Sequence, residues 1–148
     1  MEIQKDFKEL LELFNAHKVE YIIVGGYAVA FYGAPRFTGD IDILVGPDGD
    51  NAKRILAALD EFGFASLDLS ETDFTSPDNV IQLGVPPIRI DIMTSLTAVT
   101  WEKAKAGKVS GDYCNTTVHF ISREDLIANK KALGRKKDQA DLEALEES

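Results

Sequence analysis

Apolar residues recur along the chain with two different spacings. In residues 4–17 they lie three or four positions apart, and this spacing predicts a helix with one stripe facing a core. The stripe consists of Phe7, Leu10, Leu11 and Phe14. Residues 21–24 (YIIV) form a continuous apolar run, which is typical of a buried strand. The pattern therefore predicts that the chain starts with a helix and continues into a buried strand.

Glycines, prolines and capping residues divide the remaining pattern into further elements. For a helix in residues 51–62, Asp50 is the expected N-cap and Gly63 the expected C-terminal stop. The other expected elements are, in order, a helix in residues 25–33, a strand in 40–45, two strands in 79–93 broken at 84–87, a helix near 97–106, a strand in 116–121, and two helices separated by Gly134. Helices at both ends with a mixed sheet between them predict an α/β (α+β) domain.

The length and composition are those of one globular unit. The 148 residues contain no repeat or linker, so we expect a single domain over residues 1–148 with a helical tail from about residue 122. No apolar run approaches the roughly 20 residues that span a bilayer, and the acidic start does not resemble a signal peptide, so a cytoplasmic protein with no membrane contact is expected. The net charge of -9 argues against a general nucleic-acid coat, because polyanion binding depends on Lys and Arg.

Three aspartates lie where strands would present them on one face. Side chains two residues apart on a strand point the same way, so Asp40 and Asp42 share a face while the isoleucines beside them pack inward. In residues 88–93 (IRIDIM) the same alternation places Asp91 on the face opposite the isoleucines. If these two strands are neighbours, the three carboxylates form one cluster. The alternative interpretation is that Asp40 and Asp42 are the solvated face of an edge strand.

A cluster of three carboxylates favours a metal site. Close carboxylates repel one another, so they stay ionised together only beside a cation. Mg²⁺ is the expected ion, because it prefers hard oxygen ligands and binds carboxylates together with substrate phosphates. Two such ions, held by Asp40, Asp42 and Asp91, would clamp an in-line displacement at phosphorus. Asp91 would also be placed to take the proton of an attacking hydroxyl.

A glycine pair lies directly between the first expected strand and the next helix. Glycine lets the backbone approach a ligand closely, and a helix start presents free N–H groups to an anion, so a triphosphate could rest at Gly25 and Gly26. Arg36 and Thr38, shortly before the carboxylates, could contact phosphate oxygens. The alternatives are an ordinary tight connection for the glycines and a solvated loop for Arg36 and Thr38.

The tail carries a group of basic residues. Its helix is expected to open at Ser122, and among its cations Lys130 and Lys137 are the ones we expect to reach a triphosphate or a nucleic-acid acceptor. A solvated face is the interpretation for the other basic residues. Asp138 and Asp141 lie three residues apart on the last helix, where they would either orient these lysines or form ordinary surface charge.

The combined pattern resembles the active-site motif of the DNA polymerase beta-like nucleotidyltransferase superfamily. The motif lies in residues 25–43 (GGYAVAFYGAPRFTGDIDI), where a glycine pair starts a helix and a D-x-D follows on the next strand, with Asp91 as the third carboxylate. In one departure, Gly26 stands where many members have serine, so a side-chain contact to phosphate is replaced by backbone.

The particular variant is similar to small bacterial nucleotidyltransferases related to abortive-infection toxins. Arg36 and Thr38 before the D-x-D carry this likeness, and residues 126–145 are similar to the closing segment of many of these proteins. The resemblance covers the chain from about residue 21 to residue 145.

This resemblance implies Mg²⁺-dependent transfer of a nucleoside monophosphate from a nucleotide triphosphate such as ATP to an acceptor hydroxyl, with pyrophosphate leaving. The acceptor would be an RNA end such as that of tRNA, a protein side chain or a small molecule, and a cognate toxin or antitoxin would be a protein partner. The alternatives are a non-catalytic, antitoxin-like protein that keeps the fold and binds a partner, and a nucleotide-binding regulator without turnover.

Overall fold

The computed structural model describes residues 5–33, 39–63, 68–85 and 88–147. In these ranges the helices are α1 (Lys5–Ala16), α2 (Gly25–Phe31), α3 (Gly49–Phe62), α4 (Glu71–Thr75), α5 (Trp101–Gly107), α6 (Arg123–Leu133) and α7 (Lys136–Glu147). The strands are β1 (Tyr21–Val24), β2 (Asp40–Val45), β3 (Val80–Val85), β4 (Ile88–Met93), β5 (Val109–Tyr113) and β6 (Thr116–Phe120).

The strands form one mixed sheet in the order β3-β4-β2-β1-β6-β5. β2 pairs in parallel with β4, and β1 pairs in parallel with β6. The β1–β2, β3–β4 and β5–β6 pairs are antiparallel. The predicted mixed sheet with flanking helices is confirmed, and its topology makes the two aspartate-bearing strands direct neighbours.

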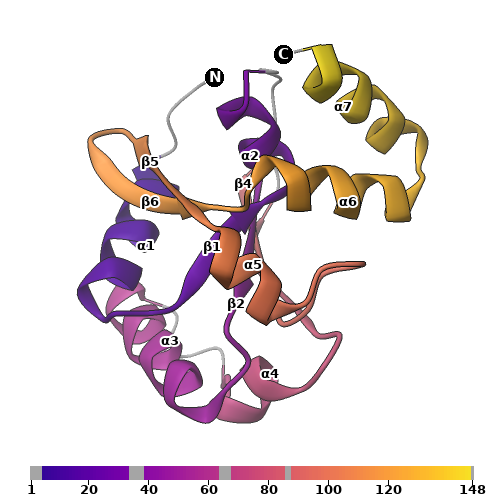
Figure 1. Cartoon of the computed structure of the whole chain (residues 1–148). Coiled ribbons are helices and arrows are strands. Elements are labelled where there is room, and N and C mark those ends of the chain that lie inside the picture. Colours follow the sequence, from indigo (N-terminus) through magenta and orange to yellow (C-terminus); the bar gives the residue numbers. More distant parts are fainter. Residues whose placement is uncertain (1–4, 34–38, 64–67, 86–87, 148) are drawn as a thin grey trace.

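The helices lie on both sides of this sheet. α1 and α3 pack against each other on one side, while α6 leads away to α7 on the other (Figure 1). Along β2 and β4 the isoleucines are buried in the core, as their alternation predicted; they are Ile41, Ile43, Ile90 and Ile92. The polar side chains of both strands therefore share the opposite face. In the described ranges no helix combines the length and apolarity that a membrane span needs.

The observed helix starts differ from two expectations. The N-cap of α3 is Asp48 rather than Asp50, because the Asp48 carboxylate accepts a hydrogen bond from the Asn51 backbone N–H at 3.0 Å. Asp50 lies in the first turn instead. α5 begins at Trp101, later than expected, because the preceding residues form a loop and the Thr100 hydroxyl caps the helix.

Two short elements, α4 and β5, lie where the sequence pattern predicted none. β5 runs through Gly111 and Asp112, which are poor strand formers, and it exists because every residue of it pairs with β6. α4 is a single short helix closed at its start by Ser70 and Asp73 in a capping box. Pairing with β6 therefore explains β5, and the capping box explains α4.

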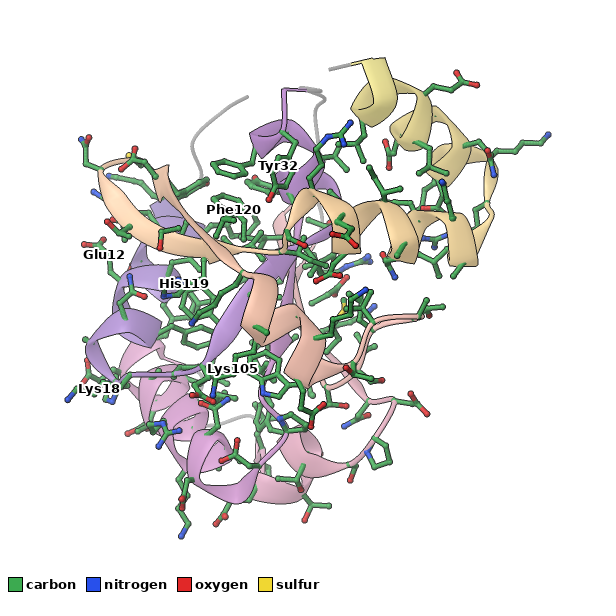
Figure 2. All side chains as sticks on the ribbon, in the orientation of Figure 1. Glu12, Lys18, Tyr32, Lys105, His119 and Phe120 are labelled. Atoms are coloured by element: carbon green, nitrogen blue, oxygen red, sulfur yellow. The ribbon has the colours of Figure 1, made fainter. Side chains whose placement is uncertain are left out.

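The end of α2 is tied to β6 and to the start of α6. The Tyr32 hydroxyl donates a 2.6 Å hydrogen bond to the carbonyl oxygen of Ile121, and Phe31 stacks on Phe120 with ring centroids 4.0 Å apart. Figure 2 shows Tyr32 and Phe120 near each other above the centre of the sheet. These contacts fix the short helix that carries Gly25 and Gly26.

Candidate active site

The register of β2 and β4 brings the three aspartates to one place. Asp42 lies opposite Asp91, and Asp40 lies opposite Arg89. Because β2 is an inner strand with β4 on one side and β1 on the other, the edge-strand alternative for Asp40 and Asp42 is wrong. All three carboxylates line a single pocket of about 430 Å³.

Three parts of the chain build the walls of this pocket. β2 and β4 contribute the carboxylates, and the β1–α2 junction contributes Gly25 and Gly26. The corner between α6 and α7 contributes Lys130, Arg135 and Lys137. The pocket therefore places acids on one wall and cations on the facing helices.

Gly25 is required at its position for two separate reasons. Its φ is +69°, in the left-handed region that side chains disfavour. A Cβ atom at Gly25 would also lie 2.2 Å from Asp42 Oδ2, far inside van der Waals contact. The backbone at this junction therefore packs directly against the Asp42 carboxylate, and the two halves of the motif are in contact.

The charged form of the Asp42 carboxyl is disfavoured in this pocket. Burial, and after it the charges of Asp91 and Asp40, raise the pKa of this carboxyl to about 6. Lys130 opposes this shift, but it does not cancel it. The charged form of Asp42 is therefore destabilised by its burial and by its two carboxylate neighbours.

Arg89 is the principal cation in direct contact with these acids. Its guanidinium Nη2 lies 2.9 Å from Asp40 Oδ2, and its Nε lies 3.2 Å from Asp91 Oδ1 without the alignment of a hydrogen bond. The sequence pattern placed Arg89 on this face, but it did not predict these ion pairs, which depend on the register between β2 and β4. Within the described ranges, no group of three or more His, Cys, Asp or Glu side chains is arranged to hold a metal ion.

Lys130 is held in the pocket wall by two buried aspartates. Its side chain is only 4% exposed, and its Nζ lies 3.2 Å from Asp138 Oδ1 and 3.1 Å from Asp141 Oδ2. Both aspartates are buried. Of the two interpretations left open for them, orientation of a lysine is the one that the structure supports.

Asp138 also holds Arg135, a pocket residue that the sequence interpretation did not single out. Arg135 Nε donates to Asp138 Oδ2 at 2.7 Å, and the Arg135 backbone N–H donates to the same oxygen at 3.1 Å. Burial acts to raise the pKa of Asp138, but hydrogen bonds from Arg135 and Lys130 outweigh burial and hold this pKa at about 2. The three-residue spacing of Arg135 and Asp138 on one helix start was the signal that could have found this pair.

The remaining predicted site residues fall into two groups. Lys137 lines the pocket and is exposed, so it is free to reach a ligand from the α7 side. Arg36 and Thr38 lie outside the described residues. Asn129, which the sequence interpretation missed, is buried, lines the pocket and donates to the carbonyl oxygen of Thr97 at 3.0 Å.

Several solved structures share this fold at low sequence identity. The lincomycin-bound lincosamide antibiotic adenylyltransferase LnuA superposes with a TM-score of 0.63 at 15% identity, over 99% of this chain and 98% of that chain. The protein TM1012 from Thermotoga maritima, a proposed nucleotidyltransferase, superposes with a TM-score of 0.64 at 21% identity, over 99% of this chain and 97% of that chain. The antibiotic-resistance factor ANT(2'')-Ia superposes with a TM-score of 0.57 at 13% identity, over 95% of this chain and 79% of that chain.

Sequence comparison identifies the family. A search of curated proteins finds no match. A family profile described as "Nucleotidyltransferase of unknown function (DUF6036)" matches residues 1–146. The predicted enzyme class, a nucleotidyltransferase, is thereby confirmed, and the chain belongs to this nucleotidyltransferase family.

Proposed function

We propose that the protein transfers a nucleoside monophosphate from a nucleotide triphosphate to an acceptor hydroxyl, with Mg²⁺ held by Asp40, Asp42 and Asp91. The observation that carries the proposal is the in-register pair Asp42 and Asp91, which opens onto a pocket with cations on its other wall. Carboxylates facing cations across a pocket suit a ligand that brings both metal ions and phosphates.

The carboxylate chemistry of Asp40, Asp42 and Asp91 suits Mg²⁺, but the three side chains would have to rearrange to hold it, because they are not positioned as a metal site. Three carboxylates line the pocket, and burial together with the charges of Asp91 and Asp40 raises the pKa of Asp42, so a bound cation would stabilise its charged form. The Arg89 side chain, which is 34% exposed, would have to release Asp40 and Asp91. Bound Mg²⁺, for which we expect two ions, would neutralise charge on the triphosphate and the leaving group.

The β1–α2 junction and the α6–α7 corner are proposed to hold the triphosphate. The close approach of Gly25 to Asp42 leaves backbone rather than side chains at the start of α2, and Gly26 follows in the first turn. Lys130 and Lys137 reach the same pocket from α6 and α7. Backbone N–H groups and these cations would orient the phosphates for in-line attack. Arg36 and Thr38 are proposed to add contacts to phosphate oxygens.

Asp91 is proposed to accept the proton of the acceptor hydroxyl. Its side chain is 11% exposed, and it lies on β4, on the side of Asp42 away from the glycine junction. The hydroxyl oxygen would bond to the α-phosphorus as its proton passes to Asp91. The bond from the α-phosphorus to the bridging oxygen would break, and pyrophosphate would leave with that electron pair.

The nature of the acceptor is a separate part of the proposal. An RNA end, a protein side chain and a small molecule each supply a hydroxyl. The net charge of -9 disfavours tight RNA binding, whereas LnuA and ANT(2'')-Ia are solved with an antibiotic or its adenylyl derivative. We therefore favour a small-molecule acceptor. A toxin–antitoxin setting with a cognate protein partner rests on the sequence resemblance alone.

The test incubates the protein with each of the four α-labelled nucleotide triphosphates, Mg²⁺ and a cell extract. We expect label on one class of acceptor, and we expect the label to disappear with EDTA and with Asp91→Asn. The control Asp112→Asn removes the same charge from β5, at the far edge of the sheet. Absence of label from every pool, together with no thermal shift by nucleotide and Mg²⁺, would contradict the proposal and favour a partner-binding protein.

A further inference from the structure

A second cavity, of about 610 Å³, adjoins the carboxylate pocket. It lies among the end of β2, the end of α4, the loop from β4 to α5, and the start of α5. Ser95 and Leu96 line both cavities, so this short segment is their shared wall. The apolar part of its lining is Pro47, Pro77, Leu96, Ala98, Val99 and Trp101. The volume is in the range that holds a drug-sized molecule.

The loop that separates the two cavities is anchored before any ligand arrives. The Thr94 hydroxyl donates to the Ser76 carbonyl oxygen at 2.6 Å, and the Ser95 hydroxyl donates to Asp78 Oδ1 at 2.7 Å. Asn129, on α6, donates to the Thr97 carbonyl oxygen at 3.0 Å. The shared wall is therefore anchored to two segments, the α4–β3 connection and α6, and the second cavity is a preformed site.

The two cavities differ in their charged side chains: the carboxylate pocket combines three carboxylates with cations, whereas the second cavity has no cation among its described lining residues. The carboxylate pocket has four cationic side chains on its walls, Arg89, Lys130, Arg135 and Lys137. Among the described residues that line the second cavity there is no Lys or Arg, and its one charged side chain is the carboxylate of Glu102. Phosphates are therefore attracted to the first cavity, whereas the second suits a ligand with an apolar surface and a positive charge.

The order of the strands also sets the direction of approach. Gly25 lies at the β1 side of Asp42, and Asp91 lies at the β4 side. β4 runs from Asp91 through Met93 into the loop that forms the shared wall. Because β1 runs antiparallel to β2, Gly25 lies toward the N-terminal end of β2, whereas this loop follows the C-terminal end of the parallel strand β4. A molecule whose hydroxyl reaches Asp91 from the C-terminal end of β4 therefore has its body against this loop.

From these observations we propose that the second cavity is the acceptor site and that it takes a hydroxyl-bearing organic amine. The apolar face of the ligand packs on Trp101, its ammonium group lies near Glu102, and its hydroxyl passes the shared wall toward Asp91. The inference rests on the proposed function, because it assigns a substrate class to the same reaction.

The single tryptophan of the chain, Trp101, supplies a direct binding signal. We would titrate the whole protein, without nucleotide, with tobramycin as a hydroxyl-rich amine and with sucrose as a neutral polyol, and follow tryptophan fluorescence. Tobramycin is expected to give a saturable change, whereas sucrose gives none. Glu102→Gln is expected to raise the dissociation constant about tenfold, which corresponds to about 1.4 kcal/mol.

A matched control removes the same charge from another surface. Glu12 is exposed on α1, which lies on the opposite side of the molecule from the β4–α5 loop (Figure 2), so Glu12→Gln is expected to leave tobramycin binding unchanged. Thr75→Phe, which fills part of the cavity from α4, is expected to weaken binding while the carboxylate pocket still binds nucleotide. This variant separates occupancy of the cavity from charge attraction at a distance.

Three results would overturn the inference. The first is that tobramycin gives no saturable fluorescence change. The second is that tobramycin gives the same fluorescence change with Glu102→Gln as with the native chain. The third is a saturable fluorescence change with ATP that tobramycin competes away, which would make the cavity a nucleobase site. Failure of this inference is distinguishable from failure of the proposed function. Nucleotide transfer that is unaffected by Glu102→Gln and Thr75→Phe would leave the reaction standing and remove the acceptor site.

Discussion

Two buried aspartates of this protein, Asp42 on β2 and Asp138 on α7, have opposite electrostatic surroundings. Asp42 has two carboxylates as neighbours, and its pKa is raised to about 6. Asp138 receives hydrogen bonds from Lys130 and Arg135, and its pKa is held at about 2. Both side chains belong to the walls or the support of one pocket. The charged form of an aspartate is therefore disfavoured at position 42 and favoured at position 138.

The difference separates structural from chemical roles. A satisfied buried carboxylate stabilises the fold and fixes the cations beside it. A carboxylate that is buried next to like charges lowers stability, and such sites cluster where a ligand supplies the missing charge. We infer that the ion pairs of the α6–α7 corner stabilise the fold, whereas the carboxylates of β2 and β4 bind cations.

The largest expected effect is that of Asp42→Asn on nucleotide transfer. Loss of one metal ligand should lower the rate by about 10² to 10³-fold. The same substitution should stabilise the metal-free fold above pH 6, because it removes a repelled charge. Label transfer and thermal unfolding in EDTA measure the two effects on the same samples. A destabilised Asp42→Asn variant would contradict the view that this carboxylate is strained.

Stability should depend on pH with opposite signs at the two aspartates. The folded state binds the Asp42 proton more tightly than the unfolded chain, so its contribution falls as pH rises from about 4 through about 6, on the order of 1–3 kcal/mol. The folded-state pKa of Asp138 is depressed, so its contribution is present above about pH 4 and is lost as pH falls toward 2. Urea unfolding in EDTA, comparing the native chain with each Asn variant across pH 3–8, measures both slopes.

Asp138→Asn should have the largest effect on stability. It leaves the buried Lys130 with one carboxylate fewer, at a cost of about 3 kcal/mol, or roughly 6–12 °C in Tm. Glu143→Gln, an exposed site on the same helix, is the control and should change Tm by less than about 1 °C. Equal Tm values for the two variants would show that the α6–α7 corner does not depend on this ion pair.

Glycine substitutions test the contact between the two halves of the motif. Gly25 and Gly134 have nearly the same positive φ, +69° and +65°, so alanine should cost about 1–2 kcal/mol at either position. Only at Gly25 would the new Cβ meet Asp42; at Gly134 the nearest atom is 3.9 Å away. Gly25→Ala should therefore lower transfer by about tenfold or more beyond the effect of Gly134→Ala. Equal transfer rates would mean that the close approach to Asp42 has no functional role.

Arg89→Gln should produce the smallest change, a tighter binding of divalent cations. Removing the guanidinium frees Asp40 and Asp91, so the affinity for Mn²⁺, used as a probe, should rise about tenfold. Lys105→Gln removes the same charge from the exposed Glu20 ion pair (Figure 2) and should leave Mn²⁺ affinity nearly unchanged. Electron paramagnetic resonance of free Mn²⁺ measures both. If the two variants bind alike, Arg89 does not compete with the metal.

The sequence predicted the acids of this site better than its cations. The alternation in residues 40–45 and 88–93 was enough to place Asp40, Asp42 and Asp91 on polar faces, because a strand has a fixed period of two. That the two strands are parallel neighbours came from the structure, since pairing across about 50 residues leaves no local signal.

The cations and the second cavity depended on contacts between distant segments. Lys130 was predicted as a ligand contact. The burial of Asp138 beside it depends on the angle between α6 and α7. Gly134 allows the chain to turn there, but it does not determine this angle. The ion pairs of Arg89 depend on strand register. The loop that forms the shared wall has no periodic pattern, and its shape follows from hydrogen bonds to two other segments, the α4–β3 connection and α6. Tertiary packing decided these features.

The central claim, nucleotidyl transfer at the strand-borne carboxylates, is tested most directly by the position of the transferred phosphate. Parallel reactions would contain the same nucleotide triphosphate labelled at either the α- or the γ-phosphate, with Mg²⁺ and the acceptor pool. We predict α-label on the acceptor, γ-label only in pyrophosphate, and no acceptor label with Asp42→Asn. Label from the γ-phosphate on the acceptor, or undiminished α-label with Asp42→Asn, would contradict the account.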